Sequence, residues 1–295
     1  MDQHIEEFKN SLLKSKKMAA SSIEAYERDI NEFSRFLTEK NLTNFSETTQ
    51  ADIAAYLLRL RQDNRSGATI NRKMASIRAF FKYMYVQGYI ADNPSIGLKT
   101  PKVMKRDIEY ISMSEVEKLL EQPDTSLKGV RDRAILELMY ATGLRVSEVI
   151  EANVEHINLR MGFITCTGEH GKARIIPLGR HARAALEDYL YECRAKILKE
   201  KEDDKALFLN YSGSRMSRQG LWKLLNEYAE AAGIEKKITP QVLRNSFAVH
   251  MLQNGADLKS LQELMGHEDM VATQVYLSVS KNRIKDVYDQ SHPRA

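Results

Sequence analysis

Four residues in the second half of the chain have side chains suited to chemistry on a phosphate group: Arg145, Arg244, His267 and Tyr276. The planar guanidinium group of an arginine can bind two phosphate oxygens at once. A tyrosine hydroxyl can act as a nucleophile, although with a pKa near 10 only about one part in a thousand is phenolate at pH 7. Two nearby guanidinium groups would help offset that cost, because they stabilise both a phenolate and the charge that builds on phosphate oxygens.

The sequence places each of these residues beside an expected helix end. Arg145 follows the turn Thr142-Gly143-Leu144 and starts a helix, so we expect its guanidinium group near backbone N–H groups at the positive end of a helix dipole. We expect Arg244 on the first turn of a helix that begins at Thr239 and Pro240. His267 follows Gly266, a C-terminal stop signal, and Tyr276 lies within an apolar stretch.

Taken singly, each residue also has an ordinary structural explanation. Arginines are usually surface ion-pair partners, a histidine after a C-terminal glycine commonly caps carbonyl groups, and a tyrosine among valines is usually part of a core. The combination becomes informative only together with a basic helix and linker that lie earlier in the chain.

The positive charge of the chain is concentrated in one window. Residues 59–106 contain 11 basic and 2 acidic residues, whereas the segments before and after are slightly acidic. Within this window ATINRKMASIRAFFKYMYVQG predicts an amphipathic helix with Ile70, Met74, Ile77, Phe81 and Met84 on one stripe and Gly88 as a stop. Its opposite face carries Asn71, Arg72, Arg78 and Lys82. No acidic residue lies at i±4, which favours a polyanion as partner over a merely solvated face.

The first part of the chain predicts a compact helical domain over residues 1–90. It contains a leading helix near Ile5 to Leu13, a helix in SSIEAYERDINEFSRFL with a Ser21/Glu24 capping box, a helix in TTQADIAAYLLRLRQ, and the basic helix. Residues 91–107 contain proline and glycine without periodicity and read as a linker. This linker is basic through Lys99, Lys102, Lys105 and Arg106.

The remaining residues, 108–295, predict a mostly helical domain with a small antiparallel sheet. A Ser114/Glu117 pair is expected to cap the first helix, and RDRAILELMYATG predicts a buried helix that ends at Gly143. FITCTGEHGKARIIPL alternates β-branched and polar residues around a glycine-containing turn, which predicts a hairpin. Further helices follow, including a final one that contains Ile284 and Val287. The fold class is therefore mainly α with a small antiparallel β-sheet.

The segments around the four residues resemble a known family. ATGLRVSE, and TPQVLRNSFAVHMLQNGADLKSLQELMGHEDMVATQVYLSV, are similar to the two catalytic boxes of the tyrosine recombinases, also called the phage integrase family. RIIPLG, after the hairpin, and the terminal HPRA look like the Xer-type members of this family, which the chain resembles over essentially its full length. The resemblance implies a helical, SAM-like core-binding domain followed by an α+β catalytic domain.

The resemblance also implies a reaction and its participants. Double-stranded DNA would be cut and rejoined through a covalent 3′-phosphotyrosine, by a homo-tetramer or a hetero-tetramer with a related recombinase on two DNA sites, without metal or cofactor. Tyr276 would be the nucleophile, and Arg145 and Arg244 would hold the scissile phosphate. His267 would hydrogen-bond the phosphate region or assist proton transfer. Arg72, Arg78, Lys82, Lys102, Lys105 and Arg106 are the candidate DNA-binding residues.

Two positions depart from the family pattern. Gln241 lies where a histidine usually stands; its amide can still donate a hydrogen bond to phosphate but cannot exchange a proton. Glu169 lies where the family usually carries the lysine that protonates the leaving 5′ oxygen. If His170 and Gly171 form a two-residue turn, Lys172 faces Glu169 across the hairpin and its ammonium group can take this role. We therefore expect a weaker site and not an inactive one.

Two functions remain open at this level. One is an active recombinase, either for chromosome-dimer resolution or for integration and excision of a mobile element. The alternative is a catalytically weakened DNA-binding partner that organises a synaptic complex, which Gln241 and Glu169 favour.

Composition limits the class of protein further. The chain has 295 residues, 43% of them hydrophobic and 28% charged, which is typical of a globular protein of about two domains. Two cysteines, Cys166 and Cys193, are too few for a disulfide framework or a four-thiolate metal site, so inert thiols are expected. We also expect no membrane segment, no signal peptide and a cytoplasmic location.

Overall fold

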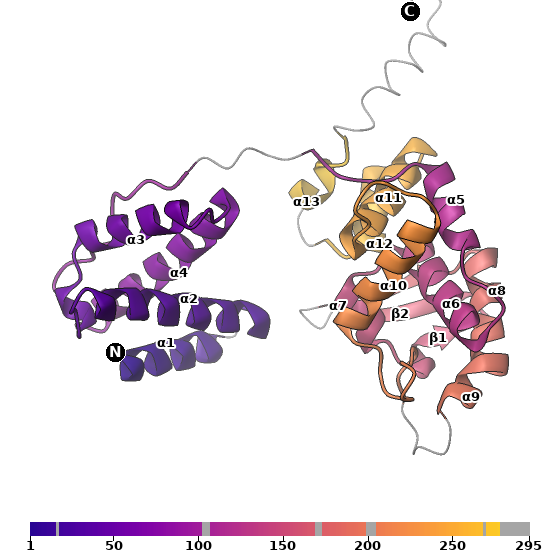
Figure 1. Ribbon diagram of the computed structural model, residues 1–295, viewed down its shortest axis with the longest axis horizontal. Coiled ribbons are helices and arrows are strands. Elements are labelled where there is room, and N and C mark those ends of the chain that lie inside the picture. The colour runs from indigo at the N-terminus through magenta and orange to yellow at the C-terminus, as the bar shows by residue number, and fades with distance from the viewer. Residues whose placement is uncertain (16–17, 102–106, 169–172, 199–204, 268–269, 278–295) are drawn as a thin grey trace, which may run out of the picture. The chain divides into compact units, whose positions relative to one another are not determined.

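A computed structural model describes the chain except for residues 16–17, 102–106, 169–172, 199–204, 268–269 and 278–295. Internal contacts divide the chain into two compact units, Met1–Arg106 and Asp107–Ala295, here called unit 1 and unit 2 (Figure 1). Each unit has a hydrophobic core of its own. No helix in the described parts of the chain is both long and apolar enough to span a membrane.

Unit 1 is built from helices around one core. Its elements are α1 (Asp2–Ser15), α2 (Ala20–Glu39), the 3₁₀ turn η1 (Phe45–Glu47), α3 (Gln50–Gln62) and α4 (Gly67–Val86). α4 packs against α1, α2 and α3. The predicted apolar stripe of α4 is confirmed, because Ile70, Met74, Ile77, Phe81 and Met84 are all buried. Gly88, just beyond the end of α4, has a φ of 75°, a conformation that glycine adopts without strain.

Neither capping box forms at the predicted residues: α2 has no side-chain cap, and α5 (Met113–Glu121) is capped two residues earlier than predicted. α2 begins after Ala19, which has no side chain that can cap, so Ser21 lies inside the first turn. α5 begins after Ser112, whose side chain accepts a hydrogen bond from the backbone N–H of Glu115. Two Ser-x-x-Glu patterns overlap here, and the helix uses the earlier one because each added helical residue contributes a further backbone hydrogen bond.

Unit 2 contains the remaining helices, and α6 is packed among α5, α8, α9 and α11 (Figure 1). α6 (Leu127–Thr142) is buried on most of its surface and contacts α5, α8 and α11. The other helical elements are α7 (Val146–Glu151), the 3₁₀ turn η2 (Val154–His156), α8 (Arg180–Asp188), the π-helical turn η3 (Tyr189–Cys193), α9 (Arg194–Leu198), α10 (Arg218–Ala231), α11 (Pro240–Gln253), α12 (Leu258–Met265) and α13 (Met270–Gln274).

A three-stranded antiparallel sheet completes unit 2, in the order β1 (Ile157–Asn158), β2 (Phe163–Thr167) and β3 (Ala173–Pro177). The predicted hairpin is confirmed as β2 and β3, whose last pair joins Thr167 to Ala173. The two-residue strand β1 is too short to show an alternation in sequence. The expected turn at residues 170–171 lies outside the described residues.

The described structure confirms a mainly helical fold with a small antiparallel sheet. Cys166 and Cys193 are free and buried, and burial raises the pKa of the Cys166 thiol to about 12. A thiol that stays protonated is a poor nucleophile, so neither cysteine is a candidate for chemistry.

Candidate active site

The fold brings together the four side chains singled out from the sequence. Arg244 Nη2 lies 3.0 Å from His267 Nε2. Arg145 Nη2 donates to the carbonyl oxygen of Gly266, the residue before His267, at 3.0 Å. The rings of His267 and Tyr276 stack with centroids 6.5 Å apart and an angle of 9° between their planes. The start of α7, α11, the residues after α12, and the residues after α13 therefore meet at one place.

Two glycines end the helices that lead into the site. Gly143 ends α6 and Gly266 ends α12, both in the left-handed conformation. A Cβ atom at Gly143 would lie 2.3 Å from the Phe247 ring, and one at Gly266 would lie 2.8 Å from the Arg174 guanidinium group. Any other residue would therefore be strained at either position, and the Phe247 ring or the Arg174 guanidinium group would also have to shift.

The guanidinium groups bind the carboxyl ends of helices, where carbonyl oxygens lack partners within the helix. Arg244 donates to the carbonyl oxygen of Gly143 and, at 2.7 Å, to that of Met265. Arg145 binds Gly266 in the same way. Arg145 is the N-cap residue of α7, as expected, and its backbone N–H donates to Glu148 at 2.7 Å. Its guanidinium group, however, binds the acceptors Glu148 and Gly266 and does not contact the N–H groups of that helix end. Arg244 is the fifth residue of α11 and so lies beyond the first turn.

Two further site residues, Glu148 and Arg174, were not found from the sequence. The carboxylate of Glu148, on α7, accepts hydrogen bonds from Arg174 Nη1 at 2.7 Å and Nη2 at 2.9 Å. It also accepts one from Arg145 Nη1 at 3.2 Å. Although burial alone raises the pKa of Glu148, its hydrogen bonds to Arg174 and to the backbone of Arg145 lower that pKa overall. The available signal was the spacing of three between Arg145 and Glu148, which brings side chains together at a helix start.

The hydrogen bonds of His267 determine its tautomer. Because arginine has no acceptor, His267 Nε2 must accept from Arg244. His267 Nδ1 then carries the proton and donates to Thr273 Oγ1 at 2.8 Å. Burial, followed by the nearby Arg244 and Arg145 charges, lowers the pKa of His267 to about 4. His267 is therefore neutral at pH 7.

Arg244 is the more deeply buried of the two phosphate-binding candidates. It is 4% exposed, whereas the Arg145 side chain is 33% exposed. Burial, and next the charge of Arg145, lowers the pKa of Arg244 to about 10, which still leaves it charged at pH 7. An arriving anion would relieve the repulsion between the two guanidinium groups.

Tyr276 is buried, and its hydroxyl donates to Asn245 Oδ1 at 3.1 Å. Burial raises its pKa above 10, while Arg244 and Arg145 act in the opposite direction. In this state the hydroxyl keeps its proton. Asn245, which connects Tyr276 to α11, was not identified from the sequence.

The amide of Gln241 is bound to Asn245 in this structure. Its Nε2 donates to Asn245 Oδ1 at 2.8 Å, the same atom that binds the Tyr276 hydroxyl. Lys172 and Glu169, and the linker residues Lys102, Lys105 and Arg106, lie outside the described residues.

The basic face of α4 is partly neutralised by another helix. Arg72 forms an ion pair with Asp29 of α2, and Arg78 donates to the carbonyl oxygen of Leu98. Lys82 is exposed. The sequence correctly excludes an acidic partner on α4 itself, but it could not show that α2 supplies one.

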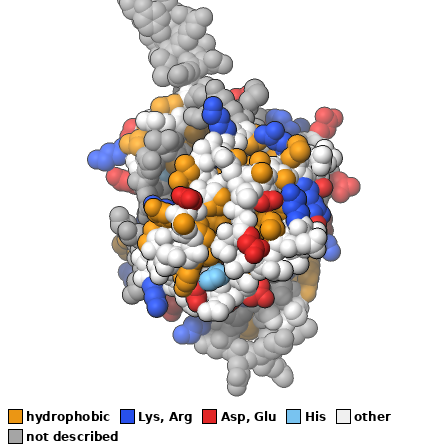
Figure 2. All heavy atoms as spheres, turned by 90° about the vertical axis from the view of Figure 1, so that its left-hand side faces the viewer, with side chains coloured by type: hydrophobic (Ala, Val, Ile, Leu, Met, Phe, Trp, Pro, Cys, Tyr) orange, Lys and Arg blue, Asp and Glu red, His pale blue; other side chains and the backbone are white. Residues whose placement is uncertain are grey.

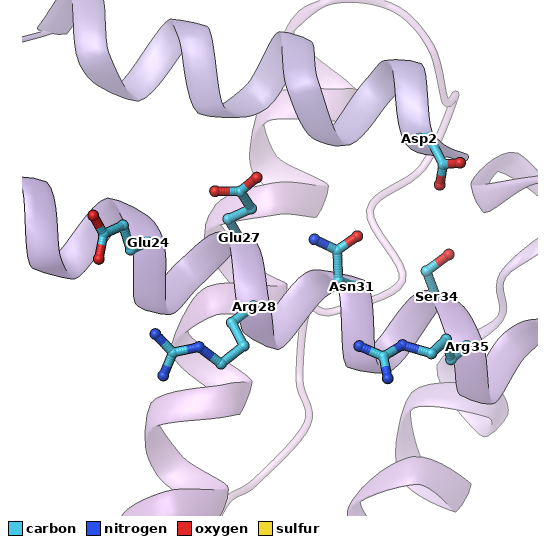
Figure 3. A pocket seen from close by; sticks show the side chains of 7 residues that line it. All are labelled: Asp2, Glu24, Glu27, Arg28, Asn31, Ser34 and Arg35. Carbon is cyan, nitrogen blue, oxygen red and sulfur yellow. The ribbon is translucent and has the colours of Figure 1, made fainter.

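Other surfaces of unit 1 are less suited to a phosphate. The face seen in Figure 2 carries exposed hydrophobic side chains with acidic ones among them, and most of its Lys and Arg side chains lie toward its edge. A hollow beside α1 and α2 is lined by three acidic, two basic and two neutral side chains: Asp2, Glu24, Glu27, Arg28, Arg35, Asn31 and Ser34 (Figure 3). In the described parts of the chain no group of three or more His, Cys, Asp or Glu residues is arranged to hold a metal ion.

Comparison with known proteins gives the same family as the site residues. Residues 109–283 match the phage integrase family, and residues 5–88 match the phage integrase N-terminal SAM-like domain. Tyrosine recombinase XerD of Listeria monocytogenes serotype 4b (strain F2365) is 43% identical over the full length of both chains. Tyrosine recombinase XerD of Oceanobacillus iheyensis is 40% identical, also over both full lengths.

Solved structures support the fold. The XerA recombinase structure covers 99% of this chain and 100% of its own, with 25% identity and a TM-score of 0.56. A lambda integrase dimer bound to a core site covers 94% of each chain, with 18% identity and a TM-score of 0.73. At 18% identity this second similarity concerns the fold alone.

The chain belongs to the phage integrase family, the tyrosine recombinases. Within that family it is a Xer-type enzyme that cleaves and rejoins DNA at specific sites. The alternative of a catalytically weakened, organising partner is not favoured, since the full-length relatives are tyrosine recombinases.

Proposed function

We propose that Tyr276 attacks a backbone phosphate of double-stranded DNA and forms a covalent 3′-phosphotyrosine. A bond forms between the tyrosine oxygen and phosphorus, the bond from phosphorus to the 5′ oxygen breaks, and the 5′ oxygen gains a proton as the tyrosine loses one. Rejoining reverses these steps with a 5′ hydroxyl from a second DNA strand. The phosphotyrosine preserves the energy of the broken bond, so the proposed cycle uses no cofactor.

Arg145 and Arg244 would hold the non-bridging oxygens of the scissile phosphate. Arg244 is anchored by two main-chain carbonyl groups and by His267, which suits a rigid, preorganised donor. Arg145 is more exposed and can turn toward an arriving phosphate. Positive charge placed before the reaction stabilises the transition state without reorganisation at the moment of attack.

His267 would act in this proposal as a neutral group. Its Nε2 accepts from Arg244 and so holds that guanidinium group in one orientation. With a pKa of about 4 it is a poor proton donor at pH 7, which favours hydrogen bonding at the phosphate region over proton delivery. Lys172 remains our candidate for the acid that protonates the leaving 5′ oxygen, and Gln241 and Glu169 remain candidates for residues that line the site.

Residues 1–90 would serve as a core-binding domain that grips the DNA backbone, with residues 91–107 as a basic linker and residues 108–295 as the catalytic domain with a C-terminal helix. The exposed Arg78 and Lys82 on α4 are suited to contact phosphates, together with Arg72, Lys102, Lys105 and Arg106. Contacts of this kind position the protein on DNA but do not read its sequence.

Strand exchange on two DNA sites calls for four active sites, so we propose a tetramer, either of this chain alone or with a related recombinase. Removing residues 281–295 would test whether the C-terminal helix docks on a neighbouring subunit. DNA binding should persist while cooperative assembly weakens. Unchanged cooperativity would place that helix against its own domain.

The observation that carries this proposal is the meeting of Arg145, Arg244, His267 and Tyr276 at one place. The test is a nicked suicide substrate carrying the target site, with which the wild-type protein should form a protein–DNA adduct that resists denaturation. Tyr276→Phe should form none, while the matched control Tyr191→Phe, at a side chain 74% exposed, should behave like wild type. An adduct with Tyr276→Phe, or none with wild type on a bound site, would refute the assignment.

Two biological roles fit this chemistry, chromosome-dimer resolution and integration or excision of a mobile element. A separate question is whether a second recombinase is required. Recombination assays on paired sites, with this protein alone and with a second recombinase added, would answer it.

A further inference from the structure

The hydrogen bond of Tyr276 goes to an amide and not to a base. Asn245 Oδ1 accepts from the Tyr276 hydroxyl at 3.1 Å. An amide carbonyl oxygen is far too weak a base to remove a phenolic proton, so this bond does not activate the tyrosine. It holds the hydroxyl in place while the proton stays on it.

The orientation of the Asn245 amide is determined by its neighbours. Asn245 Nδ2 lies 2.9 Å from the backbone carbonyl oxygen of Glu109, which can only accept. The Asn245 oxygen must therefore face the other way, toward Gln241 Nε2 and the Tyr276 hydroxyl. A reversed amide would place its oxygen against the Glu109 carbonyl oxygen, with no proton between them. The hydroxyl of Tyr276 must then be the donor.

A phenolate could not remain in this position at low cost. The charged oxygen would face the negative end of the Asn245 carbonyl dipole, and a hydrogen bond that only the neutral form can make disfavours the charged form. Among the residues that the structure describes, the charged or titratable side chains that face Tyr276 are Arg244, Arg145 and the stacked ring of His267. The arginines favour the phenolate, and Asn245 opposes them.

We propose that Asn245 is a positioning residue for the nucleophile, whose side-chain carbonyl holds the Tyr276 hydroxyl in a protonated resting position that must be left before attack. Gln241 supports this position by donating to the same oxygen. Gln241 therefore acts through Asn245 while the tyrosine is at rest. The inference rests on the proposed role of Tyr276 as nucleophile.

Three variants test the proposal in the full chain. Asn245→Leu has a similar volume but no acceptor, whereas Asn245→Asp keeps an acceptor and makes it charged. Asn254→Leu is the matched control, because Asn254 bonds the carbonyl oxygen of His250 at the far end of the same helix. Each variant is mixed in excess with the nicked suicide substrate, and the single-turnover rate of adduct formation is measured from pH 6 to pH 9, with melting temperature and DNA affinity as checks.

We expect opposite changes from the two Asn245 variants. Loss of a neutral hydrogen bond to the resting tyrosine should make Asn245→Leu about five-fold faster across the pH range. The stronger bond to a carboxylate should make Asn245→Asp about ten-fold slower, displacing its pH profile to higher pH. A merely structural role would slow both variants and would leave the pH profile in place.

The outcomes separate the two proposals. If Tyr276→Phe still forms the adduct, the proposed function fails and this inference fails with it. If Tyr276→Phe forms none, but folded Asn245→Leu is not faster or Asn245→Asp is not slower, only the role of Asn245 is wrong. Should Asn245→Leu fail to fold, the nearly isosteric Asn245→Asp decides, with a rate equal to or above wild type overturning the proposal.

Discussion

The carboxylate of Glu148 binds Arg174 through two parallel hydrogen bonds, 2.7 and 2.9 Å long, and shares one of its oxygens with Arg145. Arg174 also donates to the carbonyl oxygen of Leu264, in α12, at 2.8 Å. One buried carboxylate therefore ties together β3, α12 and the turn that carries Arg145. The position of Arg145, the less buried of the two phosphate-binding candidates, thus depends on two residues, Glu148 and Arg174, that need not touch DNA.

Replacing Glu148 with Gln should destabilise unit 2 strongly. The change leaves two arginines without their countercharge in a largely buried setting, and breaking a buried pair costs about 3 kcal/mol. Urea unfolding followed by circular dichroism measures the change. Glu187→Gln, which breaks an exposed pair with Arg183, is the control and should cost about 0.5 kcal/mol or less. Equal losses would mean that the Glu148 network contributes little.

Arg244 and Arg145 should contribute differently to the stability of the fold, but both should be required for DNA cleavage. Arg244→Ala removes the donor that the described residues provide to the carbonyl oxygens of Gly143 and Met265, and should cost about 3 kcal/mol. Arg145→Ala should cost about 1 kcal/mol, because Glu148 retains Arg174. Both should slow adduct formation by about 100-fold or more. The same loss of stability in both variants would contradict the structural distinction.

Acid should destabilise the protein through His267. Its pKa is about 4 when folded and about 6.5 when unfolded, so between these values the unfolded chain binds more protons. The contribution of His267 is complete above about pH 6.5 and is lost as the pH falls toward 4. The drop in melting temperature from pH 7.5 to pH 5 should therefore be smaller for His267→Gln. An equal drop in His267→Gln and in wild type would contradict this role of His267.

The salt dependence of DNA binding should report on the basic face of α4. Each phosphate contact contributes about 0.9 to the slope of log K against log salt. Removing Arg72, Arg78 and Lys82 together should flatten this slope, with Lys82→Gln contributing more than Arg72→Gln because Arg72 already pairs with Asp29. Lys9→Gln, in a pair with Glu27, should have no effect. An unchanged slope for the triple variant would mean that this face is merely solvated.

Lys172→Ala should slow cleavage of ordinary DNA and recover largely on a substrate with a 5′-thiolated leaving group. A thiolate leaves without needing a proton, so only the loss of a general acid is rescued. Rates on both substrates, measured in single turnover, provide the comparison. Equal loss on the two substrates would remove Lys172 as the acid.

Much of the local structure followed from the sequence because it depends on neighbouring residues. The apolar stripe of α4, the N-cap Thr239 before Pro240, and the glycines that end α6 and α12 all have local patterns. The types and order of Arg145, Arg244, His267 and Tyr276 likewise indicated phosphate chemistry before any fold was known.

The contacts of those side chains required the tertiary structure. Arg145 lies at the N-terminus of α7 as expected, but the sequence did not show that its guanidinium group binds the carboxyl end of α12. Arg72 was expected without a countercharge, which α2 in fact supplies. Glu148 with Arg174, and Asn245 with Tyr276, join segments far apart in sequence. Residue type and local periodicity determine what a side chain can do, whereas hydrogen-bond partners across the fold depend on packing between distant elements, which no local pattern encodes.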